Sequence, residues 1–384
     1  MEPYGIYIHV PFCGQKCPYC DFYSLSASEE TKNSYIRALL SDLERYRNQG
    51  LTADTLYFGG GTPSLLSVGQ LSQLVDKVRE IFSLSGEITL EANPGTVKKE
   101  QLYALQKAGF NRISFGMQSA VKKELELLGR THSPDEVSQA VDWAREAGFD
   151  NISVDLMLGI PLQTRESCQV TLSFAEHLGV DHISAYLLKV EERTRFHRKE
   201  IFDLLPDEDS VCDFYLLTCE TLKKIGLFQY EISNFARPGR ESRHNLKYWE
   251  RVPYLGFGPS AHSFDGTKRF YYSRSLSDYL AHPGKHLLTE EERVDPLEEY
   301  VLLGLRLSKG ISISYLENQF GIDPKPVLLW AKPYLSHNLI KICNNRLFCT
   351  PEGFLLSNTI IASLLSFIAK DTSSTYTCFE NRNK

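Results

Sequence analysis

The chain of 384 residues lacks an apolar run long enough to cross a bilayer. The apolar stretch near its C-terminal end, TIIASLLSFIA, is shorter than the roughly 20 residues that a spanning helix needs. A secretory signal is also missing, because Glu2 and Pro3 stand where such a signal carries basic residues, and the apolar run from Ile6 is short. These absences predict a cytoplasmic protein.

An excess of basic charge is missing too. The sequence has 42 lysines and arginines against 48 aspartates and glutamates, which gives a net charge of −6. Proteins that bind nucleic acids usually present a basic face to the phosphates, so this balance argues against a nucleic-acid partner. The composition is otherwise that of a globular protein, 42% hydrophobic and 23% charged, and the length predicts two domains.

The nine cysteines lack the pairing pattern of a disulfide framework. Six of them stand among ordinary or apolar neighbours and are expected to be reduced thiols: Cys168, Cys212, Cys219, Cys343, Cys349 and Cys378. The other three, Cys13, Cys17 and Cys20, fall within eight positions in the segment HVPFCGQKCPYCDFYS. Their density marks them as candidate metal ligands.

Short β-rich runs alternate with helical patterns up to about residue 200, which predicts an α/β fold. The predicted strands cover residues 5–10, 54–59, 87–92, 111–116, 151–157 and 182–188. The helices predicted between them cover residues 34–46, 70–82, 98–107, 135–147 and 167–178. Strands that are apolar on both faces are typical of parallel sheets, and right-handed crossovers would wind them into a partial (β/α)6 barrel. Alternation alone leaves an open doubly wound sheet as a second interpretation.

The alternation fails in the later part of the chain. Residues 1–280 are expected to form the barrel and its extension, and the polar residues 281–296 a linker. Residues 297–370 are expected to form a small helical or winged-helix-like domain, and the polar residues 371–384 a disordered tail. From Pro296 on, the chain has nine basic and seven acidic residues and is almost neutral, so DNA binding by this domain is not expected.

Three thiolates spaced as in C-x3-C-x2-C can meet one centre if their loop curls around it. A structural zinc ion would need a fourth protein ligand, which is not nearby. A four-iron cluster is normally held by four cysteines, so three would leave one iron open for a substrate. Three unrelated loop cysteines and a zinc site with a remote fourth ligand remain the alternatives.

The motif resembles the signature of radical S-adenosylmethionine proteins, because it follows a first strand and has Tyr19 before its last cysteine. The resemblance implies a 4Fe-4S cluster held by Cys13, Cys17 and Cys20. It also implies that the amino and carboxylate groups of S-adenosylmethionine chelate the open iron. In such proteins the cofactors carry the chemistry, and the protein orients and shields them.

The same resemblance assigns a binding pocket for S-adenosylmethionine. The turn YFGGGTPS, residues 57–64, follows the second strand, and its glycines let the backbone approach an amino-carboxylate closely. Polar residues follow further strands. The residues that the resemblance places in this pocket are Tyr7, Tyr19, Gly60, Gly61, Thr62, Glu91, Gln118, Arg130 and Asp155.

Several further segments narrow the resemblance to one family. In chain order they are YIHVPFCGQKCPYCDF, YFGGGTPSLL, SFGMQS, LGRTH, DLMLGIPLQT, HISAYLL and YEISNFARPG. They are similar to the family that contains the anaerobic coproporphyrinogen III oxidases and the HemW heme chaperones. The oxidases carry a fourth cysteine where this chain has Phe22, and a longer segment before the cluster motif than the twelve residues that precede Cys13. Both differences favour the chaperone branch.

The segment RHNLKYW, residues 243–249, resembles the heme-binding motif of these chaperones. A neutral imidazole is a good axial ligand of heme iron, so His244 is the expected ligand. Tyr248 and Trp249 are expected to offer flat apolar faces to the porphyrin.

The sequence therefore predicts a heme chaperone with three ligands: heme, a 4Fe-4S cluster and S-adenosylmethionine. The family suggests a membrane respiratory complex as the heme acceptor, and the sequence does not decide between a monomer and a homodimer. The alternative is an oxygen-independent coproporphyrinogen III oxidase, a radical enzyme that forms protoporphyrinogen. These motifs do not decide whether the chain is an enzyme.

Overall fold

The computed structural model describes residues 2–285, 287–288 and 295–380. The chain forms two compact units. The first contains Met1–Phe228, Ser233–Tyr248 and Val252–Glu291, and the second contains Gln229–Ile232, Trp249–Arg251 and Glu292–Lys384. None of the described helices is long and apolar enough to cross a membrane.

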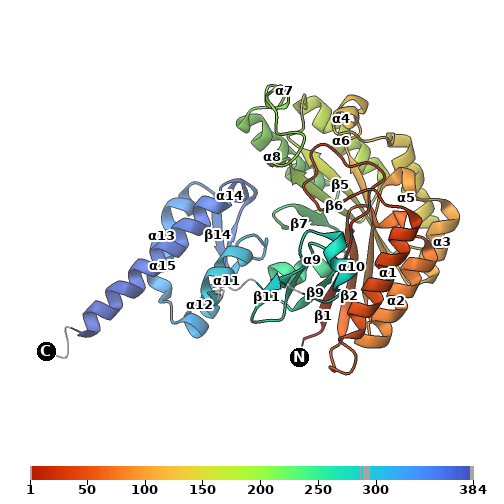
Figure 1. Ribbon diagram of the computed structural model, residues 1–384. Helices are drawn as coiled ribbons and strands as arrows, with labels where there is room; N and C mark the ends of the chain where they lie inside the picture. The colour runs from red at the N-terminus through yellow and green to blue at the C-terminus, as the bar shows by residue number, and fades with distance from the viewer. Residues whose placement is uncertain (1, 286, 289–294, 381–384) are drawn as a thin grey trace. The chain divides into compact units, whose positions relative to one another are not determined.

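Six parallel strands form the centre of the first unit (Figure 1). They are β1 (Tyr4–Val10), β2 (Ala53–Gly60), β3 (Glu87–Ala92), β4 (Arg112–Gln118), β5 (Asn151–Leu158) and β6 (His182–Leu187). Each pairs in parallel with the next strand along the chain. A doubly wound sheet would reverse its strand order at a switch point, whereas this order runs without reversal. The predicted partial (β/α)6 barrel is confirmed.

Shorter strands extend the sheet at both edges. They are β7 (Phe228–Glu231), β8 (Asn234–Ala236), β9 (Tyr254–Phe257), β10 (His262–Phe264), β11 (Arg269–Tyr271) and β12 (Leu287–Leu288). The complete order is β12-β11-β10-β9-β1-β2-β3-β4-β5-β6-β8-β7. Strand β9 is parallel to β1, and β8 is antiparallel to β6.

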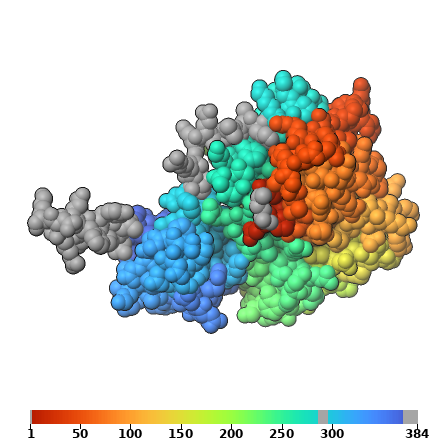
Figure 2. Space-filling model, turned by 90° about the horizontal axis from the view of Figure 1, so that it is seen from below, coloured from red at the N-terminus to blue at the C-terminus, as the bar shows by residue number. Residues whose placement is uncertain are grey.

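Helices between the strands cover the outer face of the sheet (Figure 1). They are α1 (Glu29–Glu44), α2 (Val68–Phe82), α3 (Lys99–Lys107), α4 (Lys122–Leu127), α5 (Pro134–Ala147), α6 (Arg165–Leu178), α7 (Lys199–Phe202) and α8 (Glu208–Lys224). Helix α1 packs against α2, α2 against α3, and α3 against α5. Figure 2 shows this part of the chain as a surface whose colour runs from red through orange to yellow.

Local sequence explains where these helices begin. Ser67 and Ser133 each accept a hydrogen bond from the backbone three residues on, which completes capping boxes at α2 and α5. Helix α1 begins five residues before its predicted start at Ser34, because Ser28 caps it by accepting a bond from the Thr31 backbone. Its first turn is polar, so a search for apolar periodicity misses it.

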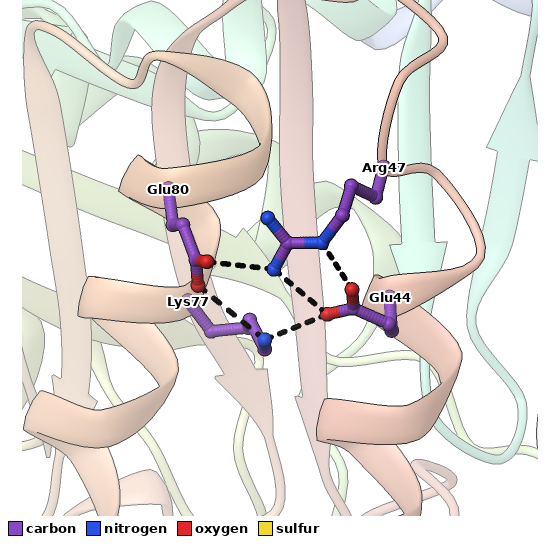
Figure 3. A network of polar contacts seen from close by, with 4 residues as sticks. All are labelled: Glu44, Arg47, Lys77 and Glu80. Carbon is purple, nitrogen blue, oxygen red and sulfur yellow. Dashed lines mark hydrogen bonds and ion pairs between the residues drawn. The ribbon is translucent and has the colours of Figure 1, made fainter.

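An exposed ion-pair network joins the end of α1 to α2 (Figure 3). Lys77 Nζ lies 2.7 Å from Glu44 Oε2, and Arg47 Nη2 lies 2.7 Å from Glu80 Oε1. Arg47 also pairs with Glu44. Water and salt screen pairs at such exposed positions, so the network fixes the spacing of the helix ends more than it stabilises the fold.

The two faces of the sheet differ in polarity. In β1, Ile6, Ile8 and Val10 are fully buried against the helices. The opposite face carries buried polar groups, among them Thr89 in β3 and Arg112 in β4. A polar interior lined by titratable side chains is costly for stability, so it points to a ligand-binding function for the barrel.

The second unit combines helices with a small antiparallel sheet of order β13-β15-β14. Its elements are α11 (Pro296–Gly304), β13 (Ile311–Ser312), α12 (Ile313–Phe320), α13 (Pro324–Ser336), β14 (Ile340–Cys343), β15 (Arg346–Cys349), α14 (Pro351–Leu355) and α15 (Ser357–Glu380). This matches the expected helical domain.

Two of the predicted domain limits can be compared with the described residues. In the segment expected as a linker, residues 281–296, positions 286 and 289–294 lie outside the described residues. Of the segment expected as a disordered tail, residues 371–380 are helical as part of α15, and residues 381–384 lie outside the described part. The helix continues because no glycine or proline interrupts residues 357–380.

Candidate functional site

The loop after β1 brings the three motif cysteines together. Cys13 and Leu25 close its base, since the Cys13 amide donates to the Leu25 carbonyl at 3.1 Å. The Cys20 amide donates to the Cys17 carbonyl at 3.2 Å, so the chain turns between these two thiols. Burial raises the pKa of Cys20, and the charges of Cys17 and Cys13 raise it further. The three cysteines therefore belong to one loop, which these backbone bonds close.

Basic side chains from distant segments hold this loop in place. Arg195 Nη2 donates to the carbonyl of Lys16 at 2.5 Å. Two arginines contact Asp21. Arg193 Nε lies 2.7 Å from its carboxylate, and Arg274 Nη2 donates to its backbone carbonyl at 2.8 Å. Three thiolates on one centre carry several negative charges, and cations beside the loop offset part of that charge.

The glycine turn after β2 lies against the cysteine loop. The Gly61 amide donates to the Val10 carbonyl at 2.8 Å, and the Thr62 amide donates to the Phe12 carbonyl at 2.7 Å. Gly60 has φ +107°, and a Cβ there would lie 2.4 Å from the His9 ring. The turn therefore requires glycine for its backbone conformation as well as for space.

A chain of hydrogen bonds links this turn to two further predicted residues. Thr62 Oγ1 donates to Cys13 Sγ at 3.7 Å and accepts from Asn93 Nδ2 at 3.2 Å. Asn93 Oδ1 in turn accepts from Arg130 Nη1 at 2.7 Å. Arg130 is also hydrogen-bonded to Tyr19, whose pKa burial raises. The structure thus assembles Cys13, Tyr19, Thr62 and Arg130 as one site.

Glu91 is partly buried next to the same turn. Its Oε1 accepts from the Tyr57 hydroxyl at 2.7 Å, and its Oε2 accepts from the Gly60 amide at 3.2 Å. Burial and the nearby charge of Asp155 raise its pKa to about 7. A partly buried carboxyl group beside a glycine turn has the chemistry to receive an ammonium group, because the charge of the ammonium favours the ionised carboxylate.

Asp155 lies deeper in the barrel interior. Its Oδ1 accepts from Ser114 Oγ at 3.0 Å, and Ser184 bonds to it as well. Burial raises its pKa, while these bonds and the charge of Arg112 lower it. Arg112 is 2% exposed, and its charge also acts on Glu91. The charge of this arginine therefore favours the ionised form of two partly buried carboxyl groups.

Gln118 ends β4 in the left-handed backbone region, with φ +66°. This conformation is uncommon for a residue with a side chain and often marks a functional position. A Cβ on Gly116 would lie 3.0 Å from Gln118 Nε2 and 3.1 Å from Arg130 Nη2. Gly116 therefore leaves the space in which the Gln118 amide and the Arg130 guanidinium lie side by side.

Tyr7 lies on the inner face of β1. Its hydroxyl shares a 3.0 Å hydrogen bond with His9 Nδ1, and its ring stacks 6.2 Å from the Tyr57 ring. The ring of His244 lies 6.4 Å away on a nearly parallel plane. Tyr7 thus connects the predicted cofactor pocket with the predicted heme motif.

The structure places His244 in the barrel interior. It belongs to α9 (Arg243–Trp249) and is 1% exposed. Its Nδ1 shares a 2.9 Å hydrogen bond with Thr55 Oγ1, and its Nε2 shares a 2.7 Å bond with the Tyr248 hydroxyl. Burial, with the charges of Lys247 and Arg112, lowers its pKa to about 3. The imidazole is neutral, as a heme ligand must be, but both of its nitrogens are engaged in this conformation.

His244 and the cysteines lie at opposite ends of the parallel strands. The backbone amide of His244 donates at 3.1 Å to Glu87, the first residue of β3, whereas the cysteine loop follows the end of β1. A strand of this length spans about 20 Å. Trp249, the last residue of the motif, is grouped with the second unit.

Several residues of this site were not predicted from the sequence. Asn93 directly follows β3 in EANPG, a position that could have marked it. Arg112 stands inside a strand that is buried throughout, where a charge is unusual. Arg193, Arg195 and Arg274 come from segments far along the chain, and no local pattern connects them with the cysteines.

A buried histidine in this polar interior predicts how stability depends on pH. His182 is 0% exposed and shares a 2.8 Å bond with Ser153 Oγ, and burial, with Arg112, lowers its pKa well below the usual value. The unfolded chain takes up this proton below about pH 6.5 and the folded chain does not, so the stability is complete above that pH and falls below it.

We therefore expect the His182→Gln variant to lose stability less steeply than the wild type between pH 6.5 and 5. The difference in slope should approach about 1.4 kcal/mol per pH unit, which corresponds to one proton. Urea unfolding at several pH values measures it. The variant His177→Gln, at an exposed position of α6, is the control and should follow the wild type. Equal slopes for all three proteins would contradict the assignment.

The residues present fit a cluster with bound S-adenosylmethionine. One closed loop supplies three thiols among cations, and the neighbouring turn exposes backbone without side chains beside a partly buried carboxylate. Among the described residues, no group of three His, Cys, Asp or Glu is spaced to hold a single metal ion. A four-iron cluster does not require that spacing, because each thiolate binds a different iron.

Comparisons with known proteins identify the families that this chain resembles. The profile of the Radical SAM superfamily matches residues 7–175, and that of the HemN C-terminal domain matches residues 292–356. The heme chaperone HemW of Bacillus subtilis (strain 168) is 34% identical over 380 residues, which cover 94% of this chain and 98% of the relative. HemW of Escherichia coli (strain K12) is 41% identical over 267 residues, 68% of this chain and 70% of the relative.

A solved structure shows the same fold. The coproporphyrinogen III oxidase HemN from Escherichia coli, a radical SAM enzyme, superimposes with a TM-score of 0.80 over 94% of this chain and 90% of that one. Its sequence is 24% identical.

Proposed function

This chain belongs to the family of the heme chaperone HemW within the radical SAM superfamily, and we propose that it binds heme and passes it to an acceptor protein. The observation that carries the proposal is the extent of the similarity. Identity of 34% extends over 98% of the Bacillus subtilis chaperone, so it includes the C-terminal domain as well as the barrel. Heme is the cargo in this proposal, and a membrane respiratory complex is the acceptor that the family suggests.

We further propose that Cys13, Cys17 and Cys20 hold a 4Fe-4S cluster. When bound, such a cluster supplies one electron to S-adenosylmethionine. The chain's own residues hold and shield the site: the turn at Gly60 and Gly61 leaves room for an amino-carboxylate, and the Glu91 carboxylate can accept its ammonium group. The predicted pocket residues Tyr7, Gln118 and Asp155 face the same interior.

Phe22 favours the chaperone over the alternative function, a coproporphyrinogen III oxidase. Its side chain is 66% exposed, and it has no atom that ligates iron, so the loop offers three thiols where the oxidase pattern has four cysteines. An exposed aromatic ring beside the loop is better suited to a contact surface than to a cluster. Turnover of coproporphyrinogen III by the reconstituted protein would place the chain with the oxidases instead.

His244 remains the proposed iron ligand. Its neutral imidazole suits heme iron, but the ring must first release Thr55 or Tyr248, because those residues occupy its two nitrogens. We expect hemin titrations of His244→Ala to show an altered Soret band and affinity reduced by about tenfold or more. The variant His177→Ala, which removes an exposed histidine from α6, is the control. Unchanged spectra for His244→Ala would exclude it as the ligand.

A further inference from the structure

The second unit contains a pocket that neither the barrel nor the cluster motif explains. Its volume is about 450 Å³, which lies within the range of small-molecule sites. The lining combines aromatic and basic side chains, among them Trp249, Tyr300, Tyr315, Lys309 and Arg346. All lining residues belong to the second unit.

One wall of the pocket is aromatic. The rings of Tyr300 and Tyr315 lie 4.7 Å apart, and Phe320 packs behind them at 5.9 Å from Tyr300. Tyr300 is held in place, because its hydroxyl accepts a 2.8 Å hydrogen bond from the Ser312 amide. Tyr315 is 44% exposed, so its ring is available to a ligand. Trp249 lines the same pocket.

The charges of the lining favour an anion. Three basic residues line the pocket, and two of them are ion-paired: Lys309 with Glu250, and Arg251 with Glu299. The positive charge left for a ligand is therefore mainly that of Arg346. Arg346 is held by the backbone: its Nε donates to the Lys309 carbonyl at 2.6 Å and its Nη2 to the Gly310 carbonyl at 2.5 Å. Carbonyl partners orient a guanidinium but leave its charge for a carboxylate.

We propose that this pocket receives the carboxylate-bearing edge of a tetrapyrrole, with Arg346 and Lys309 at the carboxylates and Tyr315 and Trp249 against the ring. The inference rests on the proposed heme-binding function and adds to it a site for the cargo. A porphyrin is a flat apolar ring with carboxylates on one edge, which matches an aromatic wall beside the guanidinium of Arg346. It also gives Trp249 a role in the motif that differs from iron ligation.

Metal-free protoporphyrin IX separates this site from the question of the iron ligand. The full-length chain is titrated with hemin, with protoporphyrin IX and with its dimethyl ester, and absorbance is followed. We expect Arg346→Gln and Tyr315→Ala each to lower the affinity for protoporphyrin by about tenfold or more, because a charge-assisted contact or a stacking face is lost. The ester, which lacks the carboxylates, should bind weakly to the wild type and lose little further in Arg346→Gln.

The control is Lys341→Gln, which removes an exposed positive charge from β14 outside the pocket and should bind as the wild type does. Thermal unfolding shows whether each variant is folded. If Arg346→Gln is not folded, the affinity of Tyr315→Ala alone tests the pocket. Wild-type affinity in both pocket variants would overturn the inference while leaving the heme function intact. A wild-type chain that binds neither hemin nor protoporphyrin in a saturable manner would refute the function and this site together.

Discussion

Replacing Cys17 with serine is expected to reduce the iron content of the anaerobically reconstituted chain from one four-iron cluster to nearly none. The loop offers three thiols, and a hydroxyl is a poor replacement for a thiolate on iron. The broad absorbance of the cluster near 400 nm should disappear with the iron. The same result is expected for Cys13→Ser and Cys20→Ser.

The control for this experiment is Cys343→Ser. Cys343 is exposed on β14 of the second unit, far along the chain from the motif. Its variant should keep the full iron content and the wild-type spectrum. A cluster that survives in Cys17→Ser would show that the ligand set lies elsewhere and would refute the assignment of the loop.

Replacing Gly61 with alanine is expected to lower the affinity for S-adenosylmethionine by about a hundredfold and the stability by about 3 kcal/mol. A Cβ at this position would lie 2.6 Å from the Phe12 carbonyl oxygen and 2.8 Å from that of Val10. Both are backbone atoms, which cannot turn aside as a side chain can. The backbone bonds from Gly61 and Thr62 to the cysteine loop would therefore be lost or stretched.

Gly14→Ala is the matched control for this variant. Gly14 lies in the cysteine loop, and a Cβ there would meet no atom within 4 Å. The control should bind S-adenosylmethionine and unfold in urea as the wild type does. Binding is measured by anaerobic equilibrium dialysis with the reconstituted protein. Equal affinities for Gly61→Ala and the wild type would contradict the assigned pocket.

The position of the two proposed sites in the barrel has a functional consequence. The cysteine loop and glycine turn follow the ends of β1 and β2, whereas His244 contacts Thr55 and Glu87 near the starts of β2 and β3. Heme on His244 would therefore not lie on the cluster. The inner-face residues between them, such as Tyr7 and Arg112, connect the two ends through the polar interior.

Much of the barrel was predictable, because each strand and helix is encoded locally by its own periodicity and caps. The six strand predictions agree with the structure to within two residues, and the cysteine motif and glycine turn were visible as contiguous segments. The hydrogen bonds from Thr62 through Asn93 to Arg130 could not be predicted from the sequence, since they join three separate loops. Side-chain contacts between distant segments depend on packing that no local pattern reports.

The heme motif illustrates the same limit. His, Tyr and Trp at this spacing identified the segment, but the pattern did not reveal that Thr55 and Tyr248 bind both nitrogens of His244. It also did not reveal that Trp249 would line a pocket with Tyr315 and Arg346, which follow it by more than 60 residues. Burial and partner identity come from the fold, so the roles of these residues became clear only in three dimensions.

The central claim is that the chain carries heme and gives it up. The most direct test loads the full-length protein with hemin and dialyses it against an excess of apomyoglobin, a globin without its heme. We predict that about one heme per chain is retained against buffer alone and that it moves to the globin when the globin is present. Heme that is never bound in a saturable manner, or that stays on the chain in the presence of the acceptor, would contradict the proposed function.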